Sequence, residues 1–147
     1  DVEASKSITI DTLSFVTPST GRMRVLVYTK SGSYKNFETN KASWRRIFWG
    51  PVVGKGSSNP AKLNRQSFKS VSVPAGETQA FYVTARNPRN VGRKRLESSG
   101  GSGGDGNVRP LDNNGAGTIT NGIGLDYLFG PTTGSAEYSG DIIFSLD

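Results

Sequence analysis

The stretch Phe68–Ala85 constrains the fold most, because it places two β-rich runs on either side of a short polar connection. In the first run Val71 and Val73 alternate with serines, and in the second Phe81 and Val83 alternate with polar or mixed residues. The connection contains a proline and a glycine, which are typical of tight turns. This pattern predicts a β-hairpin whose strands each bury one face in a core.

Other runs rich in β-branched and aromatic residues are separated by turn residues, and no helical pattern of comparable strength occurs. We therefore expect an all-β fold, an antiparallel two-sheet β-sandwich of about seven or eight strands, of which the jelly roll is one form. The first and last strands, Ser7–Val16 and Tyr138–Leu146, are expected to pair, and the second strand, Met23–Lys30, is expected in the middle of a sheet. The further strands are predicted at Ser7–Val16, Met23–Lys30, Asn40–Trp49 (after a turn), Ala116–Thr120, Gly124–Phe129 and Tyr138–Leu146.

With 147 residues the chain has the length of one domain, so we expect a single β-sandwich over residues 1–147. A flexible, basic, Gly/Ser-rich loop is predicted at about residues 86–114. Its tract Ser98–Gly104 is typical of native flexible chain and of engineered linkers alike. The chain begins at Asp1 rather than with methionine, which suggests a processed protein or a piece of a larger one.

The residue composition restricts the chemistry, because the sequence contains neither cysteine nor histidine. Thiol nucleophiles, disulfides, thiolate metal sites and the usual general base are therefore excluded. A carboxylate pair or a Ser/Lys or Thr arrangement remains, but no spacing selects one, although Asp126 and Asp141 lie beside aromatic residues. We expect a noncatalytic protein. No apolar run is long enough to cross a bilayer, so membrane insertion is not expected.

The net charge of +6 is unevenly distributed along the chain. Basic residues concentrate in residues 21–70 and 86–109, whereas the part after Pro110 contains acids and no base. Such polarity favours attraction to a polyanion with strong sensitivity to salt. The alternative is a solvated surface that keeps the domain soluble.

A basic loop is the first candidate binding site, since guanidinium groups bind carboxylate, sulfate and phosphate oxygens in pairs. Anionic polysaccharide, hydrated silica and nucleic acid would all satisfy it, and a solvated disordered loop is the alternative. Sequence-specific nucleic-acid binding is not expected, because a β-sandwich has no recognition helix and no RNA-recognition motif occurs. The candidate binding residues of the basic loop are Arg86, Arg89, Arg93, Lys94 and Arg95.

Aromatic residues form the second candidate site. Exposed Tyr34 and Trp44 would stack on sugar rings, and Arg46 beside them would hold an acidic or hydroxylated sugar. Strand alternation places Trp44 and Arg46 on one face and Trp49 on the other, so the aromatics cannot all be exposed together. We expect at least one tryptophan in the core.

A hard-cation site is the third candidate. Asp105, Asn107 and Asp112 place oxygen ligands on a Gly-rich loop, which suits calcium. The EF-hand spacing that ends in a glutamate is missing, and clusters of this kind also form turns. No other cofactor is expected.

Five parts of the sequence carry a resemblance to a known module, namely Val25–Tyr34, Trp44, Val53–Gly56, Ala75–Thr84 and Tyr138–Phe144. In these parts, and over most of its length outside the Gly/Ser tract, the chain resembles an uncharacterised β-rich module that recurs in predicted secreted and cell-wall proteins of diatoms and related algae. The resemblance implies an extracellular or cell-wall module and names no ligand. In strand count the chain is also similar to galactose-binding, discoidin-like sandwiches.

These observations together predict an extracellular, noncatalytic module that attaches a larger protein to an anionic or carbohydrate-rich cell-wall matrix of polysaccharide or silica. The alternative is a structural or protein-interaction domain that self-associates or binds a partner through strand edges or the acidic C-terminal part. Salt distinguishes the two, because ionic attachment weakens as ionic strength rises and apolar association does not. A third hypothesis, a carboxylate-based glycan hydrolase, predicts product release from a polysaccharide.

Overall fold

The computed structural model describes residues 1–86, 93–94, 108–120, 122–125, 129, 132–136 and 138–147. Its secondary structure is β throughout, with two short 3-10 turns, η1 (Lys41–Ser43) and η2 (Arg65–Ser67). In these residues no helix is long and apolar enough to cross a membrane. The strands are β1 (Val2–Ala4), β2 (Ile8–Phe15), β3 (Arg22–Ser31), β4 (Arg45–Val53), β5 (Ala61–Lys62), β6 (Val71–Val73), β7 (Thr78–Arg86), β8 (Arg93–Lys94), β9 (Val108–Pro110), β10 (Gly117–Thr120), β11 (Gly122–Leu125), β12 (Thr132–Ala136) and β13 (Ile142–Leu146).

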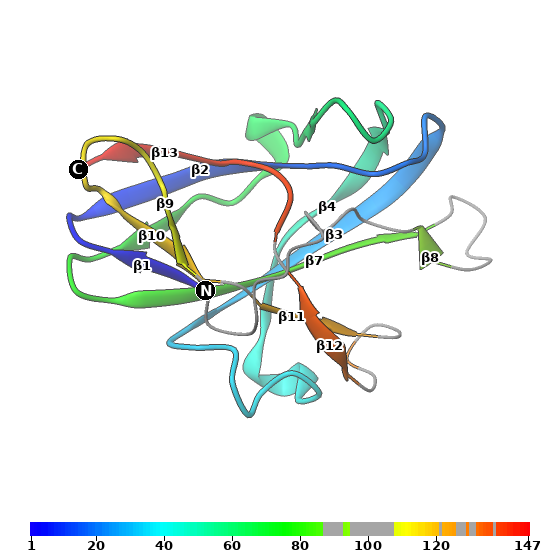
Figure 1. Cartoon of the computed structure of the whole chain (residues 1–147). Helices are drawn as coiled ribbons and strands as arrows, with labels where there is room; N and C mark the ends of the chain where they lie inside the picture. Colours follow the sequence, from blue (N-terminus) through cyan, green and yellow to red (C-terminus); the bar gives the residue numbers. More distant parts are fainter. Residues whose placement is uncertain (87–92, 95–107, 121, 126–128, 130–131, 137) are drawn as a thin grey trace.

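The strands form two main antiparallel sheets, which confirms the predicted β-sandwich (Figure 1). The larger sheet has the order β4-β3-β7-β1-β10-β9, with β8 added beside β7. The smaller sheet has the order β13-β2-β5, with β6 also paired to β2, and β11 pairs with β12 in a separate hairpin. This strand order does not establish the jelly roll, which stays a prediction.

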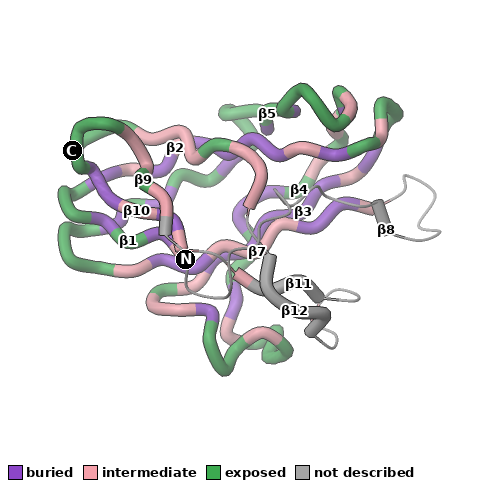
Figure 2. The backbone as a smooth tube through the Cα atoms, viewed as in Figure 1, coloured by how far each residue is buried: buried purple, intermediate pink, exposed green. Residues whose placement is uncertain are grey.

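The core lies between the two sheets and follows from the alternation of the strands. Ile8 and Ile10 of β2 and Val25 and Val27 of β3 are fully buried and belong to one hydrophobic cluster. Figure 2 shows the buried residues along the central strands of both sheets. The expected position of β3 in mid-sheet is confirmed, since it lies between β4 and β7.

The first long strand and the last one pair, as predicted. β2 runs antiparallel to β13, with Ile8 opposite Leu146 and Leu13 opposite Ile142. A register shift between Ile143 and Phe144 interrupts the ladder. The last strand is therefore joined to the first long strand in the smaller sheet, whereas β1 lies in the larger sheet between β7 and β10.

The predicted hairpin over residues 68–85 is wrong. β6 pairs with β2 in the smaller sheet, whereas β7 pairs with β3 and β1 in the larger sheet. The turn itself is present, with the amide of Glu77 donating to the carbonyl of Pro74 and with Gly76 at φ +83°. The same Pro/Gly turn therefore serves as a corner between sheets, because both of its strands pair with partners distant in sequence.

The predicted loop at 86–114 contains more strand than expected. Arg93–Lys94 pairs with the end of β7, on the edge that β3 leaves open, and Val108–Pro110 pairs with β10. The rest of the basic and Gly/Ser-rich stretch, residues 87–92 and 95–107, lies outside the described residues. Its predicted flexibility stays a prediction.

A second hydrophobic cluster covers part of the outer face of the larger sheet. Tyr28 and Tyr82, cross-strand partners on β3 and β7, pack against Trp44 and Phe129. The rings of Tyr82 and Phe129 are stacked with centroids 5.2 Å apart. The backbone of Phe129 has φ +57°, in the left-handed region. The remaining part of this outer face carries the candidate site.

Candidate functional site

The predicted stacking residues Tyr34 and Trp44 are buried, so the exposed surface expected from them is absent. Tyr34 is 7 % exposed and Trp44 is 9 % exposed, and both belong to the second hydrophobic cluster on the outer face of the larger sheet. The indole Nε1 of Trp44 donates to the carbonyl of Phe37 at 2.8 Å, which satisfies its one polar atom. The expectation that at least one tryptophan lies in a core is confirmed, and that tryptophan is Trp44.

The exposed tryptophan is Trp49, and a β-bulge earlier in β4 brings Arg46 to the same face. Val27 is opposite Phe48 and Tyr28 is opposite Arg46, so that Ile47 is an additional residue on β4. At a bulge two consecutive residues oppose one partner, and here both Ile47 and Phe48 reach the core. The shift places Arg46 and Trp49 on the same outer face, contrary to the predicted alternation, and Trp49 is 52 % exposed.

Two arginines gather at the Trp49 ring. The guanidinium carbon of Arg24 lies 4.9 Å from the ring centre, and that of Arg46 lies 5.8 Å from it. Both distances are in the range of cation–π attraction. We name the surface around them the arginine–tryptophan face, which consists of Arg22, Arg24, Arg46, Trp49 and Arg86.

Strand register extends this face across three neighbouring strands. Arg24 on β3 is directly opposite Arg86 on β7, and Arg86 is directly opposite Arg93 on β8. Adjacent strands are about 4.8 Å apart, so the three positions form a row across the sheet. Two predicted binding residues, Arg86 and Arg93, thus belong to the same row as Arg24.

The arginines of the arginine–tryptophan face form no ion pair with an acid of the described residues. Among the residues that the structure describes, the only ion pair joins Arg65 to Asp11 at 3.1 Å, in another part of the molecule. Arg22 and Arg46 are exposed, and Arg24 and Arg86 are half-buried. Their guanidinium groups therefore keep free donors for an anionic ligand.

The other predicted basic residues are placed less fully. Lys94 is opposite Ala85 in the β7–β8 pair, which is one position out of register with the arginine row. Arg89 and Arg95 lie outside the described residues. The structure thus brings Arg46, Arg86 and Arg93 of the predicted set to one sheet, whereas Tyr34 and Trp44 are buried in the second hydrophobic cluster.

The predicted calcium ligands are only partly described. The Oδ1 atom of Asp112 accepts from the amides of Asn114 at 3.1 Å and Ala116 at 3.0 Å, so it holds a turn before β10. Asp105 and Asn107 lie outside the described residues. Within the described part, no three acidic side chains come together as a metal site would require, and the calcium site stays a prediction.

Sequence reasoning missed Arg22, Arg24 and Trp49, although a signal for the arginines was present. Arg22 and Arg24 alternate with Met23 and Val25 at the start of a strand, which places both arginines on the face away from the core. The shared face of Trp49 and Arg46 has no comparable signal, because the bulge between them leaves no mark in the hydrophobic pattern.

Comparisons with protein-family models, with curated proteins and with solved structures gave no match to this chain.

Proposed function

We propose that this protein is a noncatalytic binding module that attaches to an anionic matrix through the arginine–tryptophan face. The observation that carries the proposal is the pair of guanidinium groups at the exposed Trp49 ring. Neither group has a carboxylate partner among the described residues. Arginine in this state binds sulfate or carboxylate oxygens in pairs. An indole beside it stacks on the apolar face of a sugar ring.

The ligand that fits this chemistry best is an anionic polysaccharide. The row Arg24, Arg86 and Arg93 offers charges in succession across the sheet, as a polymer with repeated anionic groups requires. Hydrated silica offers repeated oxyanions but no sugar ring for Trp49. A place in an extracellular or cell-wall matrix accords with such a ligand and is part of the proposal.

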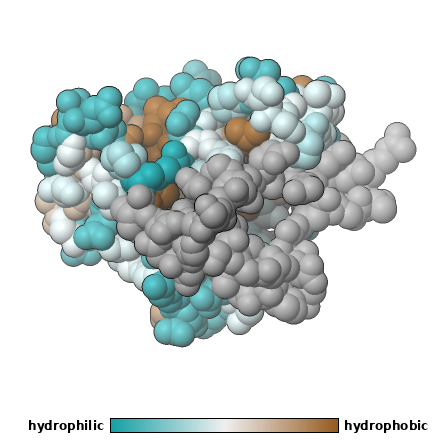
Figure 3. All heavy atoms as spheres, in the orientation of Figure 1, coloured by the Kyte–Doolittle hydropathy of each residue, from teal (hydrophilic) through white to brown (hydrophobic). Residues whose placement is uncertain are grey.

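Self-association is the second candidate, and the exposed apolar residues of β4 favour it. Trp49 and Val53 are 52 % and 57 % exposed on an edge strand of the larger sheet. Pro51 lies between them, and proline on an edge strand hinders pairing with another chain. On the side seen in Figure 3, hydrophobic residues of the described part form patches among hydrophilic ones.

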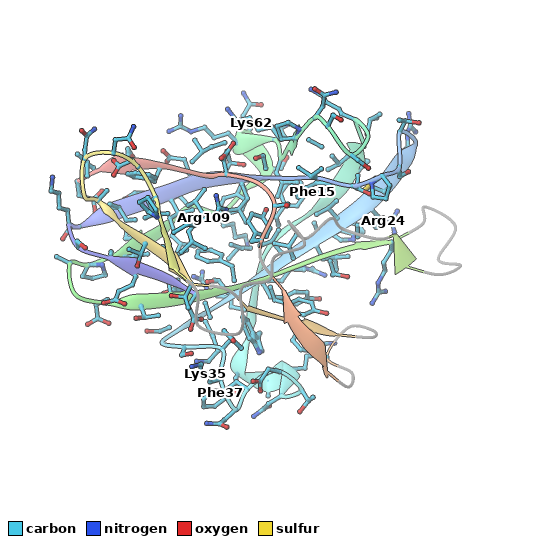
Figure 4. All side chains as sticks on the ribbon, viewed as in Figure 1. Phe15, Arg24, Lys35, Phe37, Lys62 and Arg109 are labelled. Carbon is cyan, nitrogen blue, oxygen red and sulfur yellow. The ribbon has the colours of Figure 1, made fainter. Side chains whose placement is uncertain are left out.

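Dextran sulfate and uncharged dextran are the matched probes for this proposal, because they share a backbone and differ in charge. The test variant is Arg24→Ala, Arg46→Ala, Arg86→Ala, and its control is Lys35→Ala, Lys62→Ala, Lys69→Ala. Each variant loses three positive charges from the net charge of +6. The control lysines are exposed, and Figure 4 shows Lys35 and Lys62 well away from Arg24.

The wild-type protein and the lysine variant should bind dextran sulfate at low salt, and the arginine variant should bind at least about tenfold more weakly. The wild type and both variants should bind uncharged dextran more weakly than the wild type binds dextran sulfate. Equal loss of binding in both variants would mean that net charge alone, and not this face, attracts the polymer. Binding by none of them would contradict the proposal itself, and light scattering would then test for self-association.

A further inference from the structure

A cleft beside the edge strand β9 carries a separate inference. It has a volume of about 300 Å³ and lies where Arg109 of the edge strand β9 meets the segment that leads into β13. This volume is at the small end of the range of ligand pockets. Figure 4 shows Arg109 toward the opposite end of the molecule from Arg24, so the cleft is distinct from the arginine–tryptophan face. Its walls include Val16, Pro60, Arg109, Tyr138, Gly140 and Asp141.

The guanidinium of Arg109 is fixed in the cleft with part of its donor capacity unused. Its Nη2 atom donates to the carbonyls of Tyr138 at 3.0 Å and Gly140 at 2.7 Å. Its Nε atom is buried and has no partner among the described residues, so it is not the donor that a ligand would meet. An arginine has five N–H donors, and the hydrogen bonds of the described residues engage Nη2, so the Nη1 group remains to donate to a ligand.

Asp141 contributes an acceptor from the same wall. Its amide donates to Ser14 Oγ at 2.9 Å and its carbonyl accepts from the amide of Ser14 at 2.9 Å, so the backbone is held on β2. The residue is exposed, and its carboxylate forms no ion pair within 4.0 Å, since the one described pair is Arg65–Asp11. Arg109 and Asp141 therefore line one cleft without neutralising each other directly.

The remaining walls combine apolar side chains with Ser139 and Gly140. Val16 and Pro60 provide aliphatic surface, and the ring of Tyr138 packs against the main core. The hydroxyl of Tyr138 donates to the carbonyl of Ser14, which fixes this side chain in the wall of the cleft. Apolar walls with a few fixed polar groups are typical of sites for small ligands.

We propose that this cleft binds one neutral, hydroxyl-rich ring, such as the pyranose of a sugar. Neighbouring hydroxyls both donate and accept, so one can donate to Asp141 while the next accepts from Arg109. An anion would be repelled by Asp141 and a cation by Arg109. A carboxylate would need the paired donors of the guanidinium, of which Nη2 is already engaged with two carbonyls, whereas a hydroxyl needs a single donor.

The test is an NMR titration of the whole chain with methyl glycosides of common neutral hexoses, at high salt so that the arginine–tryptophan face is screened. We expect amide shifts centred on Val16 and residues 139–141, with a dissociation constant of about 1 mM. Asp141→Ala should weaken this binding at least about tenfold. The control Glu77→Ala, which removes an exposed acid elsewhere, should bind as the wild type does.

Three outcomes would overturn the inference. They are the absence of shifts with every neutral glycoside, unchanged affinity in Asp141→Ala, and shifts at these residues with glycine, a zwitterion, in place of the sugars. The proposed attachment is tested independently, because the variant with Arg24, Arg46 and Arg86 replaced by alanine should retain the glycoside binding. The NMR spectrum of Asp141→Ala shows whether this variant is folded, which makes its affinity comparable with that of the wild type.

Discussion

Arg24 and Arg86 are direct cross-strand partners on β3 and β7, although both carry a positive charge. Like charges at directly opposite positions destabilise a sheet. A third arginine, Arg93, occupies the position opposite Arg86 on the next strand. A row that opposes folding in this way is consistent with a surface shaped for binding an anion, which would relieve the repulsion.

Replacing Arg86 with threonine should therefore stabilise the protein while weakening its binding to dextran sulfate. Removal of a like-charge neighbour is worth about 0.2–1 kcal/mol, and threonine is favourable in strands. The gain in the free energy of unfolding should shrink at high salt, because screening already weakens the repulsion. Urea unfolding at low and high salt measures it. A loss of stability at low salt would show that Arg86 serves the fold instead.

Replacement of the two tryptophans by alanine should affect stability to different extents, and the loss of binding is expected for Trp49→Ala. Trp44→Ala removes a buried ring and should destabilise the protein by about 3–5 kcal/mol. Trp49→Ala removes a half-exposed ring and should cost less than about 1 kcal/mol, while it weakens binding to sulfated polysaccharide. Unfolding curves and binding isotherms of both variants provide the measurement. If Trp49→Ala bound normally, the stacking role of its ring would be wrong.

Two glycines should differ in their tolerance of a methyl group for geometric reasons. Gly76 has φ +83° but open space around it, so Gly76→Ala should cost roughly 1–2 kcal/mol of backbone strain. A Cβ at Gly54 would overlap the carbonyl oxygen of Ser19, so Gly54→Ala should cost about 3 kcal/mol or more. Thermal unfolding of the two variants should rank them in this order, and the reverse order would refute the described packing.

The stability of the protein should fall in strongly alkaline solution because of Tyr138. Burial raises the pKa of its phenol well above the usual value of 10.0, chiefly because the charged form would lose its hydration. Above pH 10 the phenol ionises in the unfolded chain but stays neutral in the folded one, so stability is lost as pH rises. Tyr138→Phe should reduce this dependence, as measured by urea unfolding across this pH range. An identical dependence in both proteins would mean that other groups cause it.

The sequence predicted the strand content and the long-range pairing of β2 with β13, because both follow from alternation and from the buried faces of these strands. It failed at the Pro74–Gly76 turn. A turn of this composition is compatible with a hairpin and with a corner between sheets, and the choice depends on which distant strands offer a free edge. That information lies in tertiary contacts and not in the local pattern.

The candidate site was predictable in its chemistry and less so in its location. The excess of basic residues pointed to an anionic ligand, and Arg46 and Arg86 were among the residues chosen. The aromatic partner was misplaced, because the second hydrophobic cluster buries Trp44 and the bulge at Ile47 brings Arg46 to the same face as the exposed Trp49. A one-residue shift in a strand reverses every later side chain, and such a shift has no signature in composition.

The salt dependence of dextran sulfate binding tests the central claim most directly. For a polyanion with a charge density like that of DNA, each ionic contact contributes about 0.9 to the slope of log K against log salt. The wild type should show a steep negative slope, and replacing Arg24, Arg46 and Arg86 with alanine should reduce it by about 2–3. A slope that stays the same in this variant would contradict attachment through the arginine–tryptophan face.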